Sequence, residues 1–215
     1  MPKSKADPDQ ISNPRKSDKP ISQRYESMTR IIFNSALGEF EIALDTDRAP
    51  VTCSYFSELI RNGTLEDSQI FRIVAASNHE SNDPCPIHVV QIGSRQGISA
   101  DKQQVRHEGT NLTGISHKKW TVSAARIGAG ELYGSFFICM RDEPALDHGG
   151  MRQTDGQGFA AFGQVVSGFE TVERLYRYSE SEEMLKTGIP IHVALLEKSS
   201  DKHLDPLSQS STTQF

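Results

Sequence analysis

Short runs of apolar residues, separated by glycine, proline and polar residues, recur along the chain and indicate a mainly β structure. In residues 39–44 the large apolar side chains of Phe40, Ile42 and Leu44 alternate with Glu39 and Glu41, as in a strand with one face on a core and the other in solvent. Runs of β-branched and aromatic residues predict seven further strands, in residues 29–34, 70–74, 87–93, 120–126, 135–140, 159–166 and 191–197.

Two segments show helical spacing of apolar residues instead. One follows Pro50, which suits the first turn of a helix because its missing N–H needs no partner there. Gly63 then suits the left-handed residue that commonly follows the end of a helix. The apolar side of residues 169–178 predicts a second, short helix.

The order of these elements favours a barrel. Strands outnumber helices, and the long irregular connections are typical of binding loops rather than of crossovers between parallel strands. We therefore predict a closed eight-stranded antiparallel β-barrel capped by two α-helices, because closure removes the exposed edges of the sheet.

Composition divides the chain into a domain and two polar ends. Hydrophobic residues make up 36% of the sequence, which is below the usual content of about 45–50%. The deficit is concentrated in residues 1–28 and 199–215, where we expect disordered polar tails. A single domain is expected between them, in residues 29–198.

Charge and cysteine content exclude several classes of protein. The net charge is −5 and no basic stripe is present, which argues against nucleic acid as the main ligand. Cys53, Cys85 and Cys139 have neither disulfide-framework nor zinc-site spacing, and the histidines have no metal-ligand spacing, so we expect no metal. No membrane-spanning run or signal peptide is apparent, so the cytoplasm is the expected location. His117 falls in a loop, where an exposed position is expected.

Arg72 stands inside an otherwise apolar predicted strand. An arginine there either extends to solvent at a sheet edge, or is paired or used in a site. Strict alternation places it on one face with Ile70 and Val74. The same alternation groups Val89 with Gln91, opposite His88 and Val90, and groups Ser135 with Phe137, opposite Phe136 and Ile138. A surface that combined these groups would offer an apolar seat with two strong hydrogen-bonding side chains, which suits a bound peptide.

The chain resembles the cyclophilin family of peptidyl-prolyl isomerases over about residues 29–198, and most closely a divergent bacterial type. Each matching segment is short, and their order and spacing together carry the resemblance. They are residues 38–44, 49–52, 71–74, 90–93, 122–126, 135–138 and 158–163.

The resemblance implies an eight-stranded barrel with two helices, isomerase activity and no cofactor. It places the catalytic arginine at Arg72 and a second catalytic residue, the family's glutamine, at Gln91, which would orient Arg72 or hold the peptide backbone. The alternative for Gln91 is that it only satisfies a backbone group of the barrel. Phe137 would lie under the substrate proline, and Val89 would complete the pocket wall.

The sequence departs from the family pattern around this pocket. Phe159 stands in place of the pocket histidine and Thr154 in place of the pocket tryptophan, which leaves the rate and cyclosporin binding open. Ser135, Arg126 and His88 also replace family residues at substrate-contacting positions. For Arg126 and Ser135, a solvated place at a loop edge is an equal alternative to contact with the substrate backbone.

These observations leave two principal functions. The first is an isomerase that accelerates rotation about X-Pro bonds in peptides and in unfolded or flexible protein segments, assists folding and acts as a monomer. The second is a proline-peptide-binding or chaperone module on the same fold with little or no turnover. A scaffold whose polar ends carry its interactions is a third alternative.

Overall fold

A computed structural model describes residues 28–66, 68–79, 84–94 and 102–196 of the chain. The predicted tails, residues 1–28 and 199–215, lie outside these ranges except for Met28. The predicted end of the domain at residue 198 lies outside them as well.

The described residues form strands and short helices in alternation. The strands are β1 (Arg30–Ser35), β2 (Gly38–Leu44), β3 (Ser68–Val74), β4 (Val89–Ser94), β5 (Gln103–Gln104), β6 (Thr121–Arg126), β7 (Glu131–Cys139), β8 (Ala160–Ser167) and β9 (Met184–Leu196). The helices are α2 (Pro50–Arg61), the one-turn α3 (Thr110–Thr113), the 3-10 helix η3 (Pro144–Leu146) and α4 (Phe169–Tyr176).

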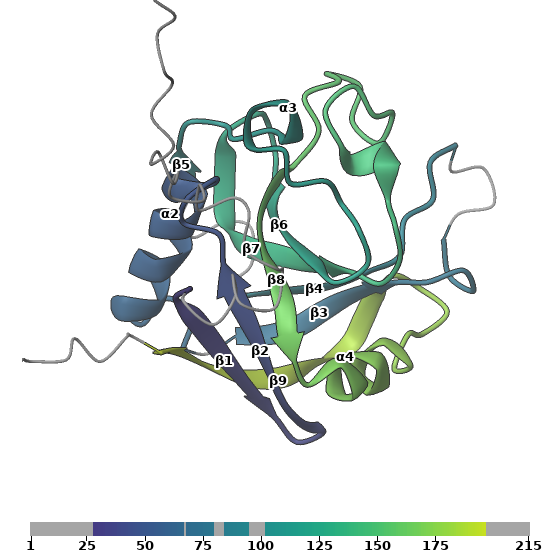
Figure 1. Cartoon of the computed structure of the whole chain (residues 1–215). Helices are drawn as coiled ribbons and strands as arrows, with labels where there is room; N and C mark the ends of the chain where they lie inside the picture. The colour runs from purple at the N-terminus through teal and green to yellow at the C-terminus, as the bar shows by residue number, and fades with distance from the viewer. Residues whose placement is uncertain (1–27, 67, 80–83, 95–101, 197–215) are drawn as a thin grey trace, which may run out of the picture.

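Eight of these strands close into an antiparallel barrel (Figure 1). Their hydrogen-bonded order is β4-β3-β9-β1-β2-β8-β6-β7, and β4 also pairs with β7, which completes the ring. The two-residue β5 adds to β7. The predicted closed barrel is confirmed, and α2 and α4 are the two predicted helices.

Helix α2 begins and ends where the sequence indicates. Pro50 is in its first turn, and Gly63 follows its end with a φ of 79°, which glycine adopts without strain. The carboxylate of Glu108 accepts the backbone N–H groups of Val51 and Thr52 at 3.1 and 2.9 Å. A distant loop residue thus supplies the acceptors that the first turn lacks. No helix in the described ranges is both long and apolar enough to span a membrane.

Stacked aromatic rings fill the barrel interior. Phe33 of β1 and Phe40 of β2 stack with ring centroids 4.7 Å apart. Phe56 of α2 stacks on Phe162 of β8 at 4.5 Å, which fastens the helix to the barrel. All four rings are fully buried.

Strand β9 differs most from its prediction, because it begins at Met184 rather than at residue 191. Gly188 and Pro190 weaken the strand pattern of its first half in the sequence, since neither residue usually lies inside a strand. That first half pairs with β3, whereas Ile191–Leu196 pairs with β1. The strand changes neighbours along its length, and the sequence pattern revealed only the half beside β1.

Candidate active site

The predicted site surface lies on the outer face of the adjacent strands β3, β4 and β7. Arg72 stands opposite Gln91 in the strand register, and Gln91 stands opposite Phe137. Val89 packs with Phe137, and Ser135 is hydrogen-bonded to Gln91. The structure therefore brings together the five side chains that alternation grouped, and their roles stay predictions.

One assignment to this face is wrong. Strict alternation placed Ile70 beside Arg72, but Ile70 packs in the barrel interior. A β-bulge between these residues sets Phe71 and Arg72 against a single residue of β4. The extra residue shifts the alternation, so Ile73 faces inward and Val74 packs on the outer face with Phe137. Bulges commonly redirect side chains next to functional sites.

The guanidinium of Arg72 is held between an amide and a carboxylate. Its Nη1 donates to Oε1 of Gln91 at 3.1 Å. Its Nε and Nη2 both donate to Oε2 of Glu183, at 3.0 and 2.5 Å. The side chain is 24% exposed, so it is neither buried in the barrel nor free in bulk solvent. This arrangement supports the interpretation of Arg72 as a paired residue within a site.

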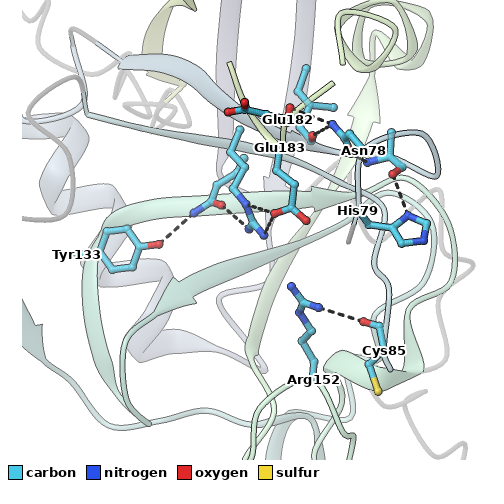
Figure 2. A network of polar contacts seen from close by, with 11 residues as sticks. Asn78, His79, Cys85, Tyr133, Arg152, Glu182 and Glu183 are labelled. Atoms are coloured by element: carbon cyan, nitrogen blue, oxygen red, sulfur yellow. Dashed lines mark hydrogen bonds and ion pairs between the residues drawn. The ribbon is translucent and has the colours of Figure 1, made fainter. Parts of the chain in front are cut away.

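Gln91 links Arg72 to polar side chains of β7. Its Nε2 donates to the hydroxyl of Tyr133 at 3.0 Å and to Oγ of Ser135 at 3.1 Å. Ser135 uses its own proton to donate to the carbonyl of Ile92 at 2.9 Å, so it accepts from Gln91. These contacts keep Oε1 of Gln91 directed at Arg72. Figure 2 shows Tyr133 and Glu183 at opposite ends of this chain of contacts.

A hollow of about 230 Å³ adjoins Tyr133 on this face. Burial raises the pKa of the Tyr133 phenol, although the hydrogen bond from Gln91 opposes the shift. The phenol therefore stays protonated at neutral pH. The residues that line the hollow are Gln69, Phe71, Gly93, Ser94, Tyr133, Ser135 and Met184.

An apolar cluster lies beside Gln91, separate from the barrel interior. Its members are Val74, Ile87, Val89, Ala125, Phe137, Cys139, Leu146 and Phe159, and we call it the outer cluster. Phe159 packs edge-on against Phe137 with ring centroids 5.4 Å apart. The two residues are only 8% and 4% exposed. Phe159 thus supplies an apolar wall but no hydrogen-bond donor, whereas Thr154, at the tryptophan position, is exposed.

Arg126 supports the segment that carries Phe159. Its Nη1 and Nη2 form a bidentate pair with Asp155, both at 2.8 Å, and its Nε donates to the carbonyl of Gly158 at 2.7 Å. The guanidinium carbon lies 5.1 Å from the centroid of the Phe159 ring. Its side chain is 1% exposed, and Ser135 is buried as well, so the solvated alternative is wrong for both residues.

His88 lies just before β4 and is buried. Its backbone N–H donates to Oε1 of Glu143 at 2.8 Å, and the same oxygen accepts Nε of Arg141. The ring Nδ1 is 3.3 Å from this oxygen but makes no hydrogen bond in the described structure. Burial and the charge of Arg141 lower the pKa of His88, so its ring is neutral at pH 7. Its contact with substrate stays a prediction.

His117 is buried, contrary to the expectation of an exposed loop position. Its Nδ1 lies 2.7 Å from Oδ1 of Asp147, its Nε2 lies 2.8 Å from Oγ of Ser123, and its ring stacks on Phe137. Burial alone would raise the pKa of Asp147, but hydrogen bonds from His117 hold it below its usual range. Ser123 is fully buried, so the trio braces Phe137 rather than presenting a nucleophile.

Sequence reasoning missed Glu183, Tyr133 and the trio of His117, Asp147 and Ser123. Glu183 belongs to the acidic stretch 180–183, a pattern typical of an exposed loop, and only the pairing of β9 with β3 brings it to Arg72. His117 and Asp147 are 30 residues apart, and no local pattern connects them. Among the described side chains, no group of three His, Cys, Asp or Glu could hold a metal ion.

Known proteins share both the sequence pattern and the barrel. The model of the family described as cyclophilin type peptidyl-prolyl cis-trans isomerase/CLD matches residues 28–194. Peptidyl-prolyl cis-trans isomerase A of Dickeya dadantii is 30% identical over 154 residues, which cover 68% of this chain and 70% of that protein. Peptidyl-prolyl cis-trans isomerase B of Escherichia coli is 23% identical over 168 residues, covering 78% of this chain and 96% of that protein.

Solved structures agree at the level of the fold. A cyclophilin type peptidyl-prolyl cis-trans isomerase of Cryptosporidium parvum superposes with a TM-score of 0.61 at 16% identity, covering 79% of this chain and 98% of that chain. A second structure of that protein, in the presence of the dipeptide Ala-Pro, gives a TM-score of 0.59 at 17% identity and covers 78% and 99% of the two chains.

The barrel, the arginine-bearing face and the family match define one class of protein. This chain belongs to the cyclophilin-type peptidyl-prolyl cis-trans isomerase family. The predicted resemblance is confirmed, and both bacterial relatives are named isomerases, which supports the enzyme over the inactive binding module.

Proposed function

We propose that this chain catalyses cis-trans isomerisation of X-Pro peptide bonds at Arg72, Gln91 and the outer cluster. The observation that carries the proposal is the guanidinium of Arg72, which Gln91 holds at the border of that cluster. A proline ring needs an apolar seat, and the amide that precedes it needs a donor close to that seat.

The chemistry follows from the resonance of the amide. Resonance sets a barrier of about 18–20 kcal/mol to rotation. As the bond twists, the proline nitrogen becomes pyramidal and its lone pair becomes a hydrogen-bond acceptor. The guanidinium of Arg72 is always charged and carries donors in a fixed fork, so it can donate to that nitrogen. This contact is stronger in the twisted state than in either planar isomer, which lowers the barrier.

The neighbouring residues position the bond. Phe137 and Val89 seat the proline ring, and Phe159 closes the apolar side. Ser135 acts through the amide of Gln91, which it orients toward Arg72.

Arg126 serves the same pocket indirectly. Its Nε, Nη1 and Nη2 already donate to Gly158 and Asp155, so it supports the peptide by holding Phe159 in place.

The proposed substrates are proline-containing peptides and flexible or unfolded protein segments. The Ala-Pro dipeptide present with the Cryptosporidium parvum relative supports this class of ligand. A role in protein folding, the cytoplasmic location, the monomeric state and the domain limits of residues 29–198 stay predictions from the sequence.

An exchange assay on an Ala-Pro peptide tests the proposal. The intact chain should accelerate cis-trans exchange measured by NMR, and Arg72→Ala should reduce kcat/KM on the order of 100-fold, as expected for loss of a charged donor to the transition state. Arg30→Ala is the matched control, because Arg30 is also a strand arginine paired with a glutamate, Glu41, on β1 and β2. It should retain the wild-type rate.

Equal rates for wild type and Arg72→Ala would reject the catalytic role of Arg72. Saturable binding of the peptide without accelerated exchange would instead select the binding module, for which the exposed Thr154 in place of an aromatic residue is the motivating observation.

A further inference from the structure

Glu183 hydrogen-bonds the side of the Arg72 guanidinium that Gln91 does not contact. Its Oε2 accepts both Nε and Nη2 of Arg72, and the two side chains are each 24% exposed. Gln91 accepts from Nη1 alone. The guanidinium is therefore held at two places on its perimeter, by the carboxylate of the residue just before β9 and by an amide from β4.

The backbone that carries Glu183 is fastened to β3. Met184 stands opposite Arg72 in the register, and the N–H of Ile73 donates to the carbonyl of Glu183 at 2.8 Å. Asn78 donates from Nδ2 to the carbonyls of Ile73 and Glu182, at 2.8 and 3.2 Å. Figure 2 shows Asn78 beside Glu182 and Glu183. These hydrogen bonds hold the backbone of Glu183 in place, and with it the position from which its carboxylate reaches Arg72.

The remaining donors of Arg72 are free to meet a ligand. A guanidinium carries five N–H donors in one plane. Three of them are used by Glu183 and Gln91, and no other described residue accepts from Arg72. Because Glu183 and Gln91 both hydrogen-bond the guanidinium, its orientation is fixed, and so are the directions of the other two N–H donors. The Arg72 side chain therefore loses little rotamer entropy when a peptide binds.

We propose that Glu183 is a positioning residue for isomerisation, which acts on the peptide bond only through Arg72. The inference rests on the proposed function. The Glu183 carboxylate is then expected to aid catalysis by fixing the orientation of the Arg72 guanidinium, although its negative charge also partly neutralises the positive charge of that group.

Kinetics of three variants test the inference. Glu183→Ala should lower kcat about tenfold with a much smaller change in KM, because the fixed donor matters most in the twisted state. Glu183→Gln retains an acceptor and should fall between Glu183→Ala and wild type. In an Arg72→Ala background, Glu183→Ala should have no further effect, because its route to the substrate is already gone.

A second measurement does not depend on activity. The Nε–H signal of Arg72 in NMR spectra of the intact chain should be ordered and slow to exchange with water, and Glu183→Ala should make it mobile and fast-exchanging. Glu41→Ala is the matched control, because Glu41 holds Arg30 in a similar pair at 2.9 Å. It should leave both kcat and the Arg72 signal unchanged.

The outcomes separate the two proposals. A wild-type chain without activity, but with an Arg72 signal that depends on Glu183, would reject the proposed function and leave the positioning intact. A Glu183→Ala variant that is as fast as wild type or faster would overturn the inference, because the carboxylate would then be idle or inhibitory. A full additional loss in the Arg72→Ala background would overturn it as well.

Discussion

The two arginines beside the outer cluster, Arg72 and Arg126, differ in how far their guanidinium groups are exposed and in what they contact. Arg126 is 1% exposed and is bound to Asp155 and to a backbone carbonyl. Arg72 is 24% exposed, and two of its five N–H donors are accepted by no described residue. Burial and the number of bound donors therefore distinguish an arginine that supports the site from one that can meet a ligand.

The pair between Arg126 and Asp155 predicts a specific dependence of stability on pH. Hydrogen bonds from Arg126 lower the pKa of Asp155 from 3.8 to about 2. Since the pKa in the folded state is the lower one, the pair stabilises the fold above about pH 4, and this contribution is lost as the pH falls towards 2. Asp155 is exposed, so solvent screening keeps the contribution modest.

Thermal unfolding of Asp155→Asn should test this dependence. The variant should melt below wild type at pH 6, and the difference should shrink as the pH falls from 4 to 2, where Asp155 of the wild type is only about half ionised. A difference in melting temperature that stays constant between pH 6 and pH 2 would contradict the assignment.

At the scale of elements, helix α2 depends on a loop that follows it far along the chain. Glu108 is buried, and its carboxylate accepts the N–H groups of Val51 and Thr52 and the Thr52 hydroxyl. The negative charge also interacts favourably with the positive end of the helix dipole. The start of α2 and the loop before α3 are therefore joined through one side chain.

Glu108→Ala should destabilise the fold by about 2–3 kcal/mol, because buried N–H groups would lose a charged acceptor. Urea denaturation followed by circular dichroism measures the change. Glu39→Ala serves as the control, since Glu39 is an exposed glutamate on β2, and it should leave the midpoint nearly unchanged. A Glu108→Ala variant as stable as this control would show that water replaces the carboxylate without cost.

Local sequence patterns predicted those elements whose pattern repeats locally, and missed those that depend on a partner. Alternation located β2 and grouped the site residues of β4 and β7, because each of these strands keeps one face on the barrel interior. The sequence did not predict the bulge before Arg72 or the first half of β9, because both arise from pairing with a neighbouring strand. Glu183 escaped for the same reason.

At the scale of the whole molecule, the barrel wall separates two apolar regions with different tasks. On β7, Ile138 faces the barrel interior, and its neighbour Phe137 faces the outer cluster. The outer cluster borders Arg72 and Gln91, whereas the interior is closed by the ring of strands and by α2. One strand thus serves the stability of the fold on one side and the proposed substrate seat on the other.

This division predicts opposite consequences for two apolar truncations. Ile138→Ala removes a fully buried interior side chain, and it should cost about 2–5 kcal/mol of unfolding free energy. Well below its melting temperature it should keep wild-type kcat and KM, because the outer surface is unaltered. Val89→Ala removes two methyl groups from the wall of the proposed seat, so it should raise KM several-fold while costing less stability. Urea denaturation and the Ala-Pro exchange assay measure the two effects side by side. If Ile138→Ala changed KM more than Val89→Ala did, the two regions would not be functionally separate, and the proline seat would have to lie elsewhere on the barrel.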